Sequence, residues 1–406
     1  MKTLVLSGGS DQIALIKELK KRNNEVVLVD YFENPPAKGY ADKHIKASTL
    51  DLDNVLEIAK KEDVGLVITA CTDQALLTMS YVSEKLGLNC YLSYEQARNF
   101  TNKLYMKEHM KNSGIPTSKY VILGSSDVCQ PSAVGLDYPL VVKPVDNNSS
   151  KGISKVNNQD ELNIALRDAK QYSRSRNVIF EQYNHGDEYS IDAFIHNGEP
   201  IIIITTKYKK ITSRNKFTIT QSSYPCELSS AIIEKIKKII TNIGQVFKVD
   251  NTPLFMQLLI ENEEVNVVEF SARTGGGSKL HFIRELTGLD IIQNLLDLTF
   301  NIPLNLNMTY KKKHAAICFI YAKAGVFHGI ENAEQLKQQS IIHDYYYYKT
   351  YGMTITDSGY SSDRPAGFFV LADSEEELAE KICFVDNNIK VLNEKGDDIM
   401  LHGVYN

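Results

Sequence analysis

A single lysine interrupts the apolar run YPLVVKP at residues 138–144, and the polar loop DNNSSKG follows at residues 146–152. A charge inside a buried strand is costly unless an opposite charge compensates it, so Lys143 indicates a bound anion. Its compact ammonium suits phosphate oxygens. Short residues and a glycine let the backbone N–H groups of the loop fold over a phosphate, and Lys151 adds charge. The alternatives are a lysine that reaches solvent from an edge strand and an ordinary hairpin loop.

Polar residues also mark the segments on either side of this stretch. Upstream, Thr101-Asn102-Lys103 opens a helix that we expect over residues 101–113, before the helix stop Gly114-Ile115-Pro116. Strands are expected at residues 140–144 and, downstream, at residues 178–182 within VIFEQYN (residues 178–184), and Glu188 follows this segment closely. Main-chain groups near Glu181 could read an adenine edge, while the Glu188 carboxylate could accept two ribose hydroxyls. A hairpin with a solvated acidic turn is the alternative.

A fourth segment combines acidic, amide and basic side chains. Two apolar strands, expected at residues 254–261 and 265–271, form a hairpin that can place Gln257 beside Glu269. An interior carboxylate needs a cation, and Mg²⁺ held by phosphates and one or two protein oxygens would satisfy Glu269. Arg273 can offer a planar fork to a phosphoryl or acyl-phosphate oxygen. The glycines at 275–277 would let a substrate approach the backbone closely.

The first hundred residues alternate between expected strands and helices, which predicts a parallel sheet with helices on its faces. The loop Gly8-Gly9 after the first strand resembles part of a dinucleotide fingerprint. That fingerprint needs further glycines where this chain has Ser10 and Ile13. We therefore interpret this loop as a tight turn beside a pocket and do not predict an NAD site.

The composition of the 406-residue chain excludes several classes of protein. The net charge of -5 argues against a dedicated nucleic-acid binder. Six cysteines without a CxxC pair fit free thiols in a reducing cytoplasm, where we expect the protein. The apolar run near the start is too short for a signal peptide or a membrane span, so no membrane partner is expected.

Taken in this order and at this spacing, the four segments resemble the ATP-grasp superfamily. The similarity is to members with carbamoyl-phosphate-synthase-like or biotin-carboxylase-like domains, including bacterial amino-acid ligases. It extends to a C-terminal unit marked by Asp363-Arg364-Pro365-Ala366-Gly367. The resemblance implies an α/β and α+β multidomain fold. Residues 1–100 would be an N-terminal parallel α/β domain, 101–308 an ATP-grasp domain with a lid at about 115–185, and 309–406 a small C-terminal α+β domain.

The resemblance also implies roles for individual residues. Arg273 and Lys151 would be catalytic, and Gln257, Glu269 and Ser271 would hold metal. ATP would be bound by Lys103, Lys143, Ser149, Ser150, Gly152, Glu181, Asn184 and Glu188. Two positions depart from the family pattern, because Gln257 replaces a carboxylate and Ser271 replaces an asparagine. Both keep an oxygen but lower the negative charge available to metal.

The expected function is an ADP-forming carboxylate–amine ligase that uses ATP with Mg²⁺, or alternatively Mn²⁺. It would make an acyl phosphate of a small carboxylate and pass it to an amine, and positioning and charge neutralisation would supply most of the catalysis. The alternatives are ATP-dependent carboxylation or carbamoyl chemistry, and a nucleotide-binding protein with weakened catalysis. A homodimer is an assembly found among relatives, and the sequence leaves the oligomeric state open.

Overall fold

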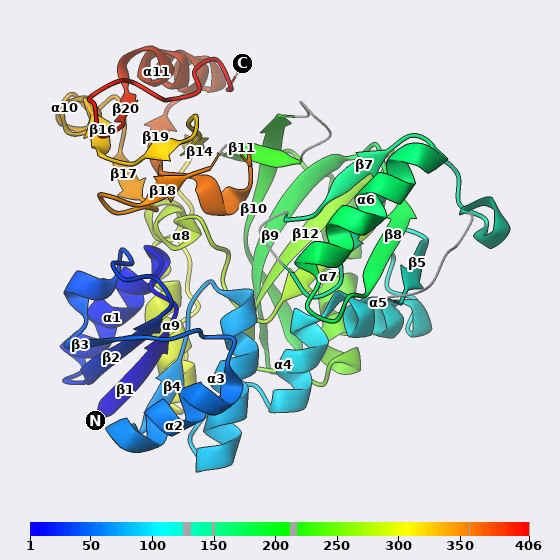
Figure 1. Ribbon diagram of the computed structural model, residues 1–406, viewed down its shortest axis with the longest axis horizontal. Helices are drawn as coiled ribbons and strands as arrows, with labels where there is room; N and C mark the ends of the chain where they lie inside the picture. The colour runs from blue at the N-terminus through cyan, green and yellow to red at the C-terminus, as the bar shows by residue number, and fades with distance from the viewer. Residues whose placement is uncertain (125–130, 148–150, 212–216, 357, 406) are drawn as a thin grey trace.

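The protein was examined as a computed structural model that describes residues 1–124, 131–147, 151–211, 217–356 and 358–405. Three regions are visible in Figure 1: an N-terminal unit in blue, a central unit in green and a C-terminal unit in orange and red. In this view the helix α8 (Lys279–Thr287) lies between the N-terminal and C-terminal units, and the helix α9 (Ile291–Thr299) lies beside the N-terminal unit. No helix among the described residues has the length and apolar character needed to cross a membrane.

The N-terminal unit is a four-stranded parallel sheet in the order β3-β2-β1-β4. Its βαβ alternation was predicted, except for the short strand β3. The elements are β1 (Lys2–Leu6), α1 (Asp11–Lys21), β2 (Glu25–Asp30), the 3-10 helix η1 (Lys38–Tyr40), β3 (Lys43–Lys46), α2 (Leu52–Glu62), β4 (Leu66–Ile68) and α3 (Asp73–Leu86). Because parallel strands end at the same edge, the loops after β1 and β4 both face the rest of the molecule.

Two helices connect this unit to the next, where we predicted one helix over residues 101–113. They are α4 (Tyr94–Thr101) and α5 (Lys103–Asn112). Ser93 caps α4 through a capping box, and the side chain of Asn102 caps α5 by accepting from the N–H of Leu104. Thr101 therefore closes the first helix, and Lys103 begins the second.

The predicted lid is a small antiparallel sheet in the order β5-β8-β6-β7, covered by one helix. Its core contains Leu140, Val142, Phe180 and Leu162. The elements are β5 (Tyr120–Leu123), the 3-10 helix η2 (Pro131–Val134), β6 (Leu140–Pro144), β7 (Ser154–Val156), α6 (Gln159–Tyr172) and β8 (Val178–Gln182). The predicted bounds of β6 and β8 are confirmed, because both are short apolar runs between polar turns.

The largest sheet has eight strands in the order β13-β12-β9-β10-β11-β14-β19-β17. Five of them, with three helices, come from the central unit: β9 (Asp187–His196), β10 (Glu199–Ile211), β11 (Thr218–Tyr224), α7 (Ser230–Val246), β12 (Thr252–Glu261), β13 (Glu264–Ser271), α8 (Lys279–Thr287) and α9 (Ile291–Thr299). The register places Gln257 directly opposite Glu269. The predicted adjacency of these two residues is thereby confirmed.

The other three strands of this sheet belong to the C-terminal unit. That unit comprises β14 (His314–Ile320), β15 (Gly325–Val326), β16 (Gly329–Glu331), α10 (Ala333–Gln338), β17 (Asp344–Tyr347), β18 (Thr354–Ile355), the 3-10 helix η4 (Ser361–Asp363), β19 (Ala366–Ala372), α11 (Glu375–Asn388) and β20 (Lys390–Leu392). The four consecutive tyrosines at residues 345–348 alternate between the two faces of the sheet, as expected for a strand. Tyr346 and Tyr348 pack on the main core, and Tyr345 packs on the C-terminal core.

Candidate functional site

Lys143 lies in the interior of the lid sheet, where β6 runs between β8 and β7. Its side chain is 4% exposed and forms an ion pair with Glu181 on β8. An edge-strand lysine that reaches solvent is therefore ruled out. Burial acts to raise the pKa of Glu181, but the charges of Lys107 and Lys143 lower it to about 2. The glutamate is consequently ionised, and it is held between two lysines.

Lys103, at the start of α5, joins the lid to the large sheet. Its Nζ donates to the carbonyl of Asn147 at 2.9 Å and lies 3.2 Å from Glu269 Oε2. The backbone N–H of Lys103 also donates to the carbonyl of Val145 at 2.8 Å. Residues predicted separately for phosphate and metal therefore meet at one helix N-terminus, a position that favours anions.

The residues predicted to hold metal lie on neighbouring strands. Glu269 is partly exposed, and Ser271 is buried two residues further along β13. Gln257 donates from Nε2 to Glu188 Oε1 at 3.2 Å, and Glu188 also pairs with Lys210. In the described part of the chain, no three His, Cys, Asp or Glu side chains gather closely enough to hold a metal. A cation here would depend on mixed oxygen ligands and on the phosphates of a nucleotide.

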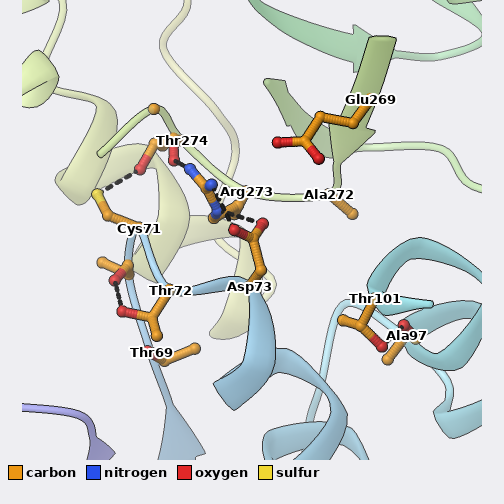
Figure 2. A network of polar contacts seen from close by, with 12 residues as sticks. Thr69, Cys71, Thr72, Asp73, Ala97, Thr101, Glu269, Ala272, Arg273 and Thr274 are labelled. Carbon is orange, nitrogen blue, oxygen red and sulfur yellow. Dashed lines mark hydrogen bonds and ion pairs between the residues drawn. The ribbon is translucent and has the colours of Figure 1, made fainter. Parts of the chain in front are cut away.

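Arg273 makes the clearest contact between the central and N-terminal units. Its Nε and Nη2 donate to the two carboxylate oxygens of Asp73 at 2.6 and 2.7 Å, and its Nη1 donates to the Thr274 carbonyl (Figure 2). Burial acts to raise the pKa of Asp73, but Arg273 holds it below the ordinary value. The sequence analysis did not identify Asp73. Its place at the start of α3, just after β4, is the signal that could have suggested it.

Hydrogen bonds hold the glycines after Arg273 between two further carboxylates. Asp11, at the start of α1, accepts from the N–H groups of Gly277 and Ser278 at 3.0 and 2.9 Å. Asp192 on β9 accepts from the N–H of Gly275 at 2.7 Å. A β-carbon added at Gly275 would lie 2.7 Å from an Asp192 oxygen, so this position requires glycine. The sequence analysis expected a substrate to lie close to this backbone. At Gly275 that space is occupied by the side chain of Asp192.

The remaining predicted residues lie within the lid. Gly152 has a φ of +72° and lies against Tyr172. Asn184 donates to the hydroxyl of Ser118 at 2.9 Å. Lys151 is described, whereas Ser149 and Ser150 lie outside the described residues.

Two cavities of unequal size bear on the location of the site. The smaller cavity has a volume of about 30 Å³ and is lined by Lys103, Glu269, Ser271, Arg273 and Asp73. Residues predicted separately to bind phosphate and metal therefore line one small space. The larger, about 770 Å³, lies between α1, α8 and the C-terminal unit. There His281 stacks on Tyr346 with ring centroids 4.8 Å apart. We place the candidate site at the smaller cavity because the buried, paired charges converge there.

Most of these paired charges lie in a stretch of the chain that is similar to a known domain family. Residues 136–281 match the family model of the ATP-grasp domain, which confirms the resemblance inferred from the sequence. The matched range includes Lys143, Glu181, Glu269 and Arg273, while Lys103 and Asp73 lie before it.

Solved structures share the arrangement of the whole chain. The L-amino acid ligase from Bacillus licheniformis superposes with a TM-score of 0.77 at 18% identity, covering 97% of this chain and 98% of that one. N5-carboxyaminoimidazole ribonucleotide synthetase from Thermotoga maritima gives a TM-score of 0.73 at 15% identity, with 97% and 99% covered. At these identities the likeness shows the fold, and it confirms the predicted fold class.

Curated relatives match over shorter stretches. A D-alanine–D-alanine ligase from Pseudomonas putida is 34% identical over 132 residues, which is 32% of this chain and 41% of the relative. The chain thus spans about two-fifths of the length of that ligase. A formate-dependent phosphoribosylglycinamide formyltransferase from Wolinella succinogenes is 24% identical over 277 residues, covering 67% of this chain and 70% of the relative.

Proposed function

We propose that the protein is an ADP-forming carboxylate–amine ligase. The observation that carries this proposal is the convergence of Lys103, Glu269, Ser271 and Arg273 on one small cavity, with Lys143 buried in the adjoining lid. Similarity to D-alanine–D-alanine ligase over the matched stretch and to the fold of an L-amino acid ligase supports this class of reaction.

In this proposal, ATP lies between the lid and the large sheet. Lys103, Lys143 and Lys151 neutralise its phosphates, and Ser149, Ser150 and Gly152 belong to the loop beside them. Glu181, Asn184 and Glu188 hold the adenosine. Glu269 offers a carboxylate to Mg²⁺ or Mn²⁺, assisted by oxygens of Gln257 and Ser271. In the ligand-free site Lys103 pairs with Glu269, and Lys143 pairs with Glu181.

The proposed reaction needs little covalent chemistry from the protein. The substrate carboxylate attacks the terminal phosphorus of ATP, which releases ADP and leaves an acyl phosphate. The amine nitrogen then attacks the acyl carbon, a C–N bond forms, phosphate departs and the nitrogen loses a proton. Arg273 neutralises the phosphoryl oxygens. We assign no side chain as a general base.

A screen for phosphate release, pairing small carboxylates with amines in the presence of ATP and Mg²⁺, tests the proposal. We expect ADP and phosphate to form only when both substrates are present, with Lys143→Ala as the inactive blank. Formation of AMP would reject the mechanism. Bicarbonate-dependent formation of ADP would instead favour the carboxylation alternative. Nucleotide binding without turnover of any pair would favour weakened catalysis, which the substitutions at Gln257 and Ser271 motivate.

The domain boundaries and the assembly belong to the same proposal. We propose domains at residues 1–100, 101–308 and 309–406, with the lid at about 115–185. A homodimer and a cytoplasmic location accord with this class of enzyme. Light scattering of the purified chain tests the assembly, and a monomeric mass at all concentrations would exclude the dimer.

A further inference from the structure

Lys107 is a fully buried lysine with no role in the reaction proposed above. It lies one turn after Lys103 on α5, and its side chain is 1% exposed. Burying an ammonium is costly unless it is paired and hydrogen-bonded, so its surroundings should explain its presence. It was not identified from the sequence, although the i,i+4 spacing from Lys103 places both lysines on one helix face.

The direct partners of Lys107 are Glu181 and Thr117, and Thr117 links the lysine to the large sheet. Its Nζ lies 3.0 Å from Glu181 Oε2 and donates to the hydroxyl of Thr117. Thr117 in turn donates to the carbonyl of Val267 on β13 at 2.8 Å. These contacts fix the ammonium from the side of α5 and β13. Lys143 approaches the other oxygen of the same glutamate from β6.

Lys107, Glu181 and Lys143 therefore form a buried triad with two positive charges and one negative charge. The neighbouring Lys103–Glu269 pair is neutral as a pair, so it does not offset the remaining positive charge. The charged groups that act on Lys107 are Glu181, Lys143 and Glu269. An excess positive charge in a desolvated site attracts an anion strongly.

We propose that Lys107 is a positioning residue for nucleotide binding: it shares the charge of Glu181, so that Lys143 keeps a positive charge available for the phosphates. This inference rests on the proposed function, because it takes Lys143 to be a phosphate ligand. Without Lys107, Lys143 would be the only cation that pairs with Glu181 among the residues that the structure describes. The two would then cancel, and the lid would lose its net attraction for a nucleotide.

The experiment measures the dissociation constant of Mg·ADP by calorimetry for the wild type, Lys107→Met, Glu181→Gln and the double variant Lys107→Met/Glu181→Gln. Lys107→Met should bind about 10- to 100-fold more weakly, the range for one lost charged contact. The double variant leaves a single positive charge on Lys143, the same net charge as in the wild-type triad, so it should bind more tightly than Lys107→Met. A residue that only supported the fold would not be rescued by removing its partner's charge.

Two further variants separate charge from packing. Lys107→Arg keeps the charge and should recover most of the affinity. Lys111→Met makes the same substitution one turn further along α5 at an exposed position and should bind like the wild type. With turnover measured, kcat at saturating ATP should change much less than KM for ATP in Lys107→Met.

Each outcome decides between the two proposals. If Lys107→Met binds Mg·ADP as tightly as the wild type, or if the double variant is no better than Lys107→Met, the role of Lys107 is refuted while the proposed function stands. If the folded wild type binds no adenine nucleotide, the proposed function itself is refuted, and the inference about Lys107 with it. Circular dichroism of each variant identifies any that fails to fold, and the double variant keeps the test decisive because it removes one charge of each sign.

Discussion

The ion pair between Asp73 and Arg273 should contribute measurably to the stability of the molecule. It joins two units through residues 200 positions apart, with contacts of 2.6 and 2.7 Å, and the side chains are only 25% and 11% exposed. Breaking a buried pair costs about 3–5 kcal/mol because one charge remains uncompensated. Since a quarter of the Asp73 side chain reaches solvent, we expect a coupling energy of about 2–3 kcal/mol, below that range.

A double-mutant cycle of Asp73→Asn, Arg273→Met and the double variant measures this coupling. The chain has 22 tyrosines and no tryptophan, so urea unfolding can be followed by tyrosine fluorescence together with circular dichroism. The exposed pair Glu57–Lys60, at 2.7 Å, serves as the control and should give no more than about 0.5 kcal/mol. A coupling for Asp73 and Arg273 that is no larger than that of the control would refute the reasoning.

The same pair predicts a pH dependence of stability. In the folded protein Arg273 holds the pKa of Asp73 below its ordinary value of 3.8. The stabilisation is therefore fully present above pH 3.8, and it is lost as the pH falls through the lower folded pKa. The Asp73→Asn variant should lack this acid-dependent loss when its unfolding midpoint is compared with that of the wild type.

Three other substitutions test separate parts of the site. Gln257→Glu adds a carboxylate opposite Glu269 and should lower the Mg²⁺ concentration for half-maximal nucleotide binding severalfold; an unchanged Mg²⁺ requirement would remove Gln257 from the metal site. Burial lowers the pKa of Lys279 to about 8, so the folded state releases a proton that the unfolded chain keeps up to about pH 10.5. Relative to Lys279→Met, the wild type should therefore gain stability between about pH 8 and about pH 10, as read from urea midpoints; parallel pH profiles would contradict this. Gly152→Ala should weaken Mg·ATP binding, because the new β-carbon would meet Tyr172 Cδ2 at 2.9 Å at a φ of +72°. Gly288→Ala, at a φ of +73° with nothing within 4 Å of the new β-carbon, should leave binding unchanged, and equal effects of the two would show that only backbone strain matters.

Local sequence patterns predicted the elements that position the site. Apolar runs between polar turns predicted the bounds of β6 and β8. The single charge inside the first of these runs identified Lys143 as a candidate site residue. The hairpin of β12 and β13 followed from two apolar strands around an acidic turn, and this placed Gln257 opposite Glu269. These predictions succeeded because each depends on periodicity over fewer than about ten residues.

Residues whose role depends on distant partners were missed. In the sequence, Asp73 looks like any acidic residue in the first turn of a helix, and only the fold places Arg273 beside it. Similarly, Lys107 looks like any helical lysine, and only the fold places Glu181 beside it. Likewise, the side chain of Gln257 turns to Glu188, a contact between strands that the local pattern could not predict. The helix α4 (Tyr94–Thr101) was not predicted, because its 8 residues are too few to show a clear helical periodicity.

The eight-stranded sheet has a consequence for dividing the chain. β14 pairs along β11, and β19 pairs along β14, so the last hundred residues extend the framework that carries Glu269 and Gln257. A truncation after residue 308 would leave the side of β11 without a neighbour, and a bare strand edge invites association between molecules. The C-terminal segment therefore covers the edge of the sheet that carries Glu269 and Gln257. Shortened versions of the chain made for expression should keep this segment.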